Sequence, residues 1–143
     1  MKNNTIKALG EIALRVKDMK VMKDFYENVL GLEVMRDFGE LVFLKIAPGY
    51  GGHIQVLALF EESISPDHGH APRFAAISHQ TTALHHLAFA IDHADYKSEL
   101  ERLQALGFEV ETMVHDWTHW KSLYLLDPEG NTVELVCYDL TMW

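Results

Sequence analysis

The stretch Tyr124-Leu-Leu-Asp-Pro-Glu-Gly-Asn-Thr-Val-Glu134-Leu-Val136 carries the clearest folding signal in the chain. An apolar run enters a turn at Pro128 and Gly130, and a second apolar run leaves it. Pro128 presets its own φ and Gly130 tolerates a positive φ, so the reversal has a local chemical cause. The two runs are therefore predicted to pair as antiparallel strands. Glu134 lies in the middle of the second run, where a carboxylate is costly unless another group pairs with it.

The bulk properties of the chain limit what it can be. With 143 residues it forms one domain or two very small ones. The only cysteine, Cys137, excludes an intrachain disulfide and indicates a reducing, cytoplasmic location. The net charge is −9 and Lys and Arg do not cluster, which argues against a nucleic-acid partner. No run is long and apolar enough for a signal peptide or a membrane span, so no membrane partner is expected.

The order of predicted elements repeats along the chain. Residues 1–60 are predicted to form one βαβββ module and residues 84–143 a second, and residues 61–83 are a linker or a long functional loop. Strands are predicted at 9–16, 32–38, 41–47 and 53–60, and then at 84–91, 108–114, 119–126 and 132–138.

Each module also carries one predicted helix. The first spans residues 19–30, begins at the cap residue Asp18, ends at Gly31 and buries the stripe Val21, Phe25 and Val29. The second begins at Asp92 or Asp95, ends at Gly107 and buries Tyr96, Leu100, Leu103 and Leu106.

Four polar residues occupy matched positions in the two modules. The repeat sets Glu11 beside His86, and Gln55 beside Glu134. By strand alternation each of the four faces away from the apolar residues of its own strand. The apolar faces are expected to pack on the helices, which leaves the four polar side chains on an open face. Alanines share that face in the first strand of each module and leave room for a ligand.

One imidazole, two carboxylates and one amide can together bind a divalent metal ion. Oxygen and nitrogen ligands suit Zn, Ni, Co, Mn or Fe. An ion would offset the charge of Glu134 and keep open positions for water or substrate. Each residue also has a plainer interpretation: a solvated carboxylate for Glu134, a hydrogen-bonded structural histidine for His86, and a residue that only orients a water for Gln55.

Three strings carry a family resemblance: Ile12-Ala-Leu-Arg-Val-Lys-Asp18, Phe25-Tyr-Glu-Asn-Val-Leu-Gly-Leu32, and the stretch from Tyr124 to Leu135. With the double βαβββ pattern they resemble the vicinal oxygen chelate superfamily, which includes glyoxalase I, extradiol dioxygenases, fosfomycin-resistance enzymes, epimerases and bleomycin-binding proteins. The resemblance covers nearly the whole chain except residues 61–83. It implies a single α+β domain with curved mixed sheets around a cavity and helices on the outer face, usually in a homodimer.

The resemblance also implies metal ligands at the four matched positions. In glyoxalase I the quartet is typically His or Gln, Glu, His and Glu, so the first two look exchanged here. Glu11 or Glu134 would then act as the general base. His53 shares the face predicted for Gln55 and could compete with it as a ligand.

Further residues are weaker candidates. Arg15 resembles a position that contacts the substrate's carboxylate, and a surface arginine is the plainer interpretation. Tyr124, which shares a strand face with Ser122 and Trp120, resembles an acid of extradiol enzymes, although an aromatic residue in a strand is often only packing. A cavity rim is predicted at His115, Trp117, His119 and Trp120, and the histidines of the 61–83 segment form either a lid or a polar loop.

Three functions remain open at this stage. The first is a metal-dependent enzyme, a glyoxalase-like lyase or isomerase acting on a small oxygenated substrate. A ring-cleaving dioxygenase fits less well, because such enzymes use two histidines and one carboxylate, unless His53 is a ligand. The second is a metal-free protein that sequesters a drug-like ligand, and the third is a structural or regulatory paralogue.

Overall fold

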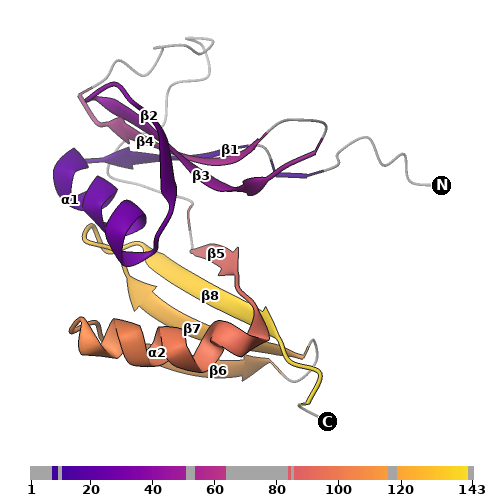
Figure 1. Cartoon of the computed structure of the whole chain (residues 1–143). Helices are drawn as coiled ribbons and strands as arrows, with labels where there is room; N and C mark the ends of the chain where they lie inside the picture. The colour runs from indigo at the N-terminus through magenta and orange to yellow at the C-terminus, as the bar shows by residue number, and fades with distance from the viewer. Residues whose placement is uncertain are drawn as a thin grey trace. The chain divides into compact units, whose positions relative to one another are not determined.

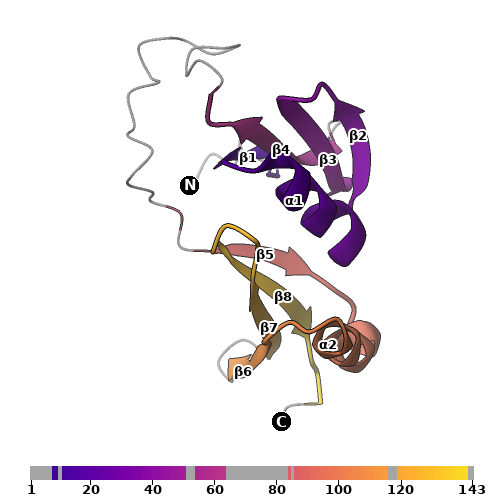
Figure 2. The ribbon, with the colours of Figure 1, turned by 90° about the vertical axis from the view of Figure 1, so that its left-hand side faces the viewer.

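The computed structural model describes residues 8–9, 11–50, 54–63, 84, 86–115 and 119–141. The chain divides into two compact units, Met1–Thr82 (unit 1) and Ala83–Trp143 (unit 2), which are drawn in Figures 1 and 2. The predictions made for His53, for Trp117 and for the histidines between residues 64 and 83 lie outside the described residues. No helix among the described residues is long and apolar enough to cross a membrane.

Unit 1 is one sheet with a helix across one face (Figure 2). Its elements are β1 (Glu11–Val16), α1 (Met19–Asp24), the π-helical turn η1 (Phe25–Val29), β2 (Glu33–Asp37), β3 (Leu41–Pro48) and β4 (Ile54–Glu61). The strand order is β1-β4-β3-β2. β1 runs parallel to β4, and the other pairs are antiparallel.

The first helix begins and ends where the sequence predicts. The Asp18 side chain accepts a hydrogen bond from the Val21 backbone N–H at 3.2 Å, and Gly31 ends the helical segment with a φ of 80°. The predicted buried stripe is right for Phe25, which is buried, and wrong for Val21, which is 42% exposed. The buried residues are Met19, Met22, Phe25 and Tyr26. The apolar face therefore follows i, i+3 and i+7 from Met19, and the wider π turn at η1 brings two adjacent aromatic residues into the core.

Unit 2 repeats the pattern of unit 1. Its elements are β5 (Leu87–Ala90), the short 3-10 helix η3 (His93–Asp95), α2 (Tyr96–Ala105), β6 (Glu111–His115), β7 (Trp120–Leu126) and β8 (Thr132–Tyr138). The strand order is β5-β8-β7-β6, with β5 parallel to β8 and the other pairs antiparallel. The predicted double βαβββ arrangement and the α+β fold class are confirmed.

Two details of unit 2 differ from the prediction. Leu106 is 56% exposed rather than part of the buried stripe. The strand predicted to begin at residue 108 begins at Glu111, because the Phe108 backbone N–H donates to the Leu103 carbonyl at 3.1 Å and so closes the helix end beyond Gly107.

Strand register divides unit 2 into a helix face and an open face. Val133, Leu135 and Cys137 alternate onto the helix face and are buried together with Leu87 and Leu103. The opposite face carries the even-numbered residues of β8, among them Glu134, and their partners on the neighbouring strands. We call this second surface the open face of unit 2.

Candidate functional site

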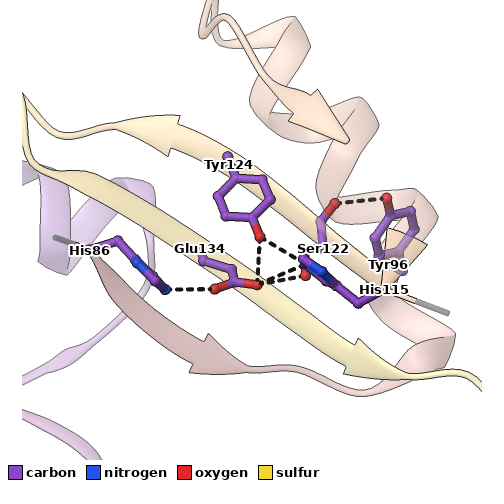
Figure 3. Close-up of polar contacts among 6 residues, drawn as sticks. All are labelled: His86, Tyr96, His115, Ser122, Tyr124 and Glu134. Carbon is purple, nitrogen blue, oxygen red and sulfur yellow. Dashed lines mark hydrogen bonds and ion pairs between the residues drawn. The ribbon is translucent and has the colours of Figure 1, made fainter. Parts of the chain in front are cut away.

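Glu134 is the centre of a polar cluster on the open face of unit 2. The register places it between Ala88 of β5 and Tyr124 of β7. His86 lies two residues before Ala88, so it shares the same face, and its side chain reaches Glu134 (Figure 3). The prediction that His86 and Glu134 share one face, beside small alanines, is confirmed for unit 2.

The carboxylate of Glu134 is buried and fully engaged. Only 6% of the residue is exposed. Its Oε1 accepts hydrogen bonds from the Ser122 hydroxyl at 2.6 Å and from the Tyr124 phenol at 3.0 Å, and its Oε2 lies 3.2 Å from His86 Nε2 (Figure 3). These contacts compensate the cost of burying the Glu134 carboxylate in the middle of an apolar strand.

The strand that carries Ser122 is itself anchored from the other side of the sheet. The Tyr96 phenol of α2 donates to the Ser122 backbone carbonyl at 3.2 Å. The side chain of Ser122, which is fully buried, points the other way, to Glu134. The helix therefore fixes the backbone from which the hydroxyl is presented.

His115 extends the cluster by one more group. Its Nε2 lies 3.0 Å from the Tyr124 phenol oxygen and 3.9 Å from Glu134 Oε1. Because the phenol donates its hydrogen to Glu134, its oxygen is left to accept one. The tautomer of His115 with hydrogen on Nε2 can donate to that oxygen. The result is a chain of hydrogen bonds from His115 through Tyr124 to Glu134. Sequence reasoning assigned His115 only to a cavity rim, and the pairing of β6 with β7 is the signal that would have found this role.

Tyr124 is held in its neutral form. Burial raises the pKa of the Tyr124 phenol, and its hydrogen bond to the Glu134 carboxylate raises the pKa further, while the contact with Ser122 acts in the opposite direction. The phenol is consequently a proton donor at neutral pH.

The His86 and Glu134 pair fits two ligands of one divalent ion. Metal–nitrogen and metal–oxygen bonds of about 2.0–2.2 Å place two neighbouring ligand atoms about 3.0–3.4 Å apart. The two atoms here are 3.2 Å apart, and the side chain of His86 is 38% exposed. The hydrogen bonds to the other oxygen of Glu134 would orient the carboxylate, as groups around metal ligands do. Within the described ranges, however, no three His, Cys, Asp or Glu side chains come close enough to hold an ion by themselves.

The register of unit 1 separates Glu11 from Gln55. Glu11 pairs with Val56 across β1 and β4, and Ala13 pairs with Ala58. Residues paired in this way lie on the same face, so strand alternation turns Gln55 to the opposite face, the one covered by α1. The prediction that Gln55 shares the open face with Glu11 is therefore wrong.

Two other predicted residues of unit 1 have mixed outcomes. Arg15 lies two residues after Ala13 in β1 and is exposed on the face of Glu11, as predicted. His53, the alternative to Gln55, lies outside the described residues.

Comparison with known proteins decides the family. A model of the glyoxalase/bleomycin resistance protein/dioxygenase superfamily matches residues 8–135. The chain belongs to this superfamily. The resemblance seen in the sequence strings and the repeated module is confirmed.

The individual relatives described next share less than 30% of their residues with this chain. The metallothiol transferase FosB of Staphylococcus epidermidis (strain ATCC 12228 / FDA PCI 1200) is 27% identical over 131 residues, which cover 91% of this chain and 81% of the relative. The crystal structure of a lactoylglutathione lyase from Agrobacterium tumefaciens is 29% identical, has a TM-score of 0.70, and matches 98% of this chain and 100% of its own. A mutant of the fosfomycin resistance protein FosX from Listeria monocytogenes, complexed with Mn(II) and 1S,2S-dihydroxypropylphosphonic acid, shares the fold at 24% identity and a TM-score of 0.66, over 96% of this chain and 95% of its own.

Proposed function

We propose that this protein is a divalent-metal-dependent enzyme that acts on a small oxygenated substrate, with lyase or isomerase chemistry of the glyoxalase type as the leading assignment. The observation that carries the proposal is the 3.2 Å separation of His86 Nε2 and Glu134 Oε2 on an open sheet face. The names of two relatives, a lactoylglutathione lyase and a metallothiol transferase, are names of enzymes and support the same class.

His86 and Glu134 would hold the ion. Glu11 is the third ligand that the family resemblance predicts, and it stays a prediction from the sequence. Gln55 is left out of the proposed set, because its side chain turns to the helix face of unit 1. When bound, the ion would supply Lewis-acid polarisation of the substrate's oxygens.

The remaining residues suggest how protons move. Both oxygens of Glu134 are already engaged, so Glu134 suits a ligand better than a base. The Tyr124 phenol would donate a proton to the substrate. His115, whose Nε2 lies 3.0 Å from the phenol oxygen, is placed to return a proton to Tyr124. Glu11 is then the remaining candidate for the general base.

The test is the metal content of tag-free protein, measured by mass spectrometry. We expect near-stoichiometric Zn, Ni, Co, Mn or Fe in the parent and its loss in the variant His86→Ala/Glu134→Ala. A matched control exists in the same unit, since His93 Nε2 lies 3.2 Å from Asp139 Oδ2. The variant His93→Ala should keep the metal, because Thr141 already engages the other oxygen of Asp139 through two hydrogen bonds and no third ligand is predicted beside this pair.

A metal-free ligand-binding protein is the second candidate. It is favoured by the lack of any ready three-residue metal cluster among the described residues. Parent protein that takes up none of the five ions, even after incubation with each, would establish this alternative and refute the enzyme proposal. A homodimer and a cytoplasmic location, both expected from the sequence, remain predictions.

A further inference from the structure

The open face of unit 2 continues beyond the polar cluster into an apolar region. Trp120 of β7 pairs with Tyr138 of β8, and Met113 of β6 pairs with Ser122. The three large side chains are exposed, by 44% for Trp120, 56% for Tyr138 and 52% for Met113. The His119 ring lies 5.6 Å from the Tyr138 ring at an angle of 49°, so Tyr138 is backed by a second ring. We call Met113, Trp120 and Tyr138 the aromatic end of the open face.

The aromatic end lies at a distance that one small molecule can span. A strand rises about 3.3 Å per residue, so Val136 is about 7 Å and Tyr138 about 13 Å from Glu134 along β8. Val136, which lies between Glu134 and Tyr138 on β8, is half-buried and carries a compact side chain, whereas its β7 partner Ser122 is fully buried. Ala90 pairs with Val136 from the other side. Ala90 is exposed, so a ligand held at Glu134 can lie over Val136 and Ala90, on the β5 side of β8 and away from the His115 side chain.

The charges on the described part of this face disfavour an anionic tail. Its described residues include the carboxylates Glu111 and Glu134 and no Lys or Arg. The nearest lysine in β7, Lys121, turns to the helix face, where its Nζ lies 4.4 Å from the centre of the Tyr96 ring. A phosphonate or carboxylate placed over the aromatic end would thus meet no described cation of this face and would be repelled by the carboxylates.

We propose that the substrate carries an uncharged apolar group, aryl or alkyl, which lies over Met113, Trp120 and Tyr138 while its oxygen-bearing end is held at His86 and Glu134. This rests on the proposed function for the oxygen-bearing end only. A ligand site commonly combines a few polar groups, which orient the ligand, with aromatic side chains, which bury its apolar surface. The open face of unit 2 has both. The substrate is then longer than a three-carbon compound.

Hydroxamates test the proposal, because they chelate divalent ions through two neighbouring oxygens and are available with different tails. Calorimetry on metal-loaded protein compares acetohydroxamate, decanohydroxamate, 4-phenylbenzohydroxamate and 4-(4-carboxyphenyl)benzohydroxamate, whose longer tails can reach the aromatic end. We expect the compound with the nonyl or the biphenyl tail to bind about tenfold more tightly than acetohydroxamate, and the added carboxylate to remove that gain. The better of the two neutral tails distinguishes alkyl from aryl substrates.

Two variants locate the effect. Trp120→Ala and Met113→Ala should abolish the preference for the larger tail and leave acetohydroxamate binding unchanged. The matched control is Val114→Ala: Val114 is adjacent to Met113, equally exposed at 51%, and pairs with Lys121 on the other face. Equal binding of all tails in the parent, or a preference that survives in Trp120→Ala, overturns the proposal.

A second experiment, without metal, tests the apolar subsite independently of the proposed metal site. With 2-naphthol as a neutral aromatic probe, the indole N–H signal of Trp120, assigned by its loss in Trp120→Phe, should shift in the nuclear magnetic resonance spectrum of chelator-treated parent protein. If no hydroxamate binds but this signal shifts, the metal proposal fails and the apolar subsite stands. If hydroxamates bind without regard to their tails and the signal stays fixed, the subsite fails and the metal proposal stands.

Discussion

Replacing Ser122 by alanine removes the shortest hydrogen bond of the Glu134 cluster. The Ser122 hydroxyl is fully buried and donates to Glu134 Oε1 at 2.6 Å. A hydrogen bond to a charged group contributes about 1.5–3 kcal/mol, and its removal leaves the buried oxygen with the longer bond from Tyr124 at 3.0 Å. We therefore expect Ser122→Ala to lower the free energy of unfolding by ~2 kcal/mol, and Tm by roughly 4–8 °C.

The assay is urea unfolding at pH 7 in the presence of a chelator, so that no ion contributes. Ser98→Ala is the matched control, because the Ser98 hydroxyl donates to the Asp95 carbonyl at 2.9 Å at an exposed position. Its loss should cost less than about 0.5 kcal/mol.

A double-mutant cycle isolates the contribution of the charge. In a Glu134→Gln background the hydroxyl donates to a neutral amide oxygen, so Ser122→Ala should cost only about 1 kcal/mol there. A cost below about 0.5 kcal/mol in the parent, or an equal cost in both backgrounds, would refute the view that Ser122 stabilises a buried carboxylate.

Two further predictions concern Tyr124 and the turn before β8. The pKa of the Tyr124 phenol is raised above its ordinary value near 10, so its contribution to stability is present below pH 10 and is lost as the pH rises through the folded-state pKa. Tyr124→Phe should therefore flatten the alkaline loss of stability and remove one of the steps that the tyrosinate absorbance titration shows above pH 10, and an unchanged titration would contradict the prediction. Gly130 has a φ of 85° and open space around its missing Cβ, so Gly130→Ala should cost about 1 kcal/mol of unfolding free energy by backbone strain alone. Gly130→Asn should cost less, since asparagine tolerates this conformation, and equal losses in urea unfolding would argue against strain as the cause.

Much of unit 2's site follows from the sequence because its signals are local. The turn at Asp127 to Asn131 fixes the β7–β8 hairpin: the Asp127 carboxylate accepts hydrogen bonds from the backbone N–H groups of Glu129 and Asn131, each at 2.9 Å. Once that hairpin is in register, alternation alone places Ser122, Tyr124 and Glu134 on one face.

The contacts that tie the site together are less visible in the sequence. His115 reaches Tyr124 only because β6 pairs with β7, and the connection between those strands contains no compact turn signal of the kind found after Leu126. The stripe of the first helix was also misjudged, since a π-helical turn changes the periodicity from which a buried face is counted. Pairing register and local helix geometry depend on tertiary packing rather than on local propensity.

The position of Gln55 shows how a match of the two modules by letters can fail. Ala13 pairs with Ala58 as Ala88 pairs with Glu134, so the residue of β4 equivalent to Glu134 is Ala58, three positions after Gln55. An odd offset places a side chain on the other face of a sheet. The β4 residues that pair with Glu11 and Ala13, Val56 and Ala58, are both apolar. Unit 1 therefore carries Glu11 alone of its two predicted ligand residues on its open face.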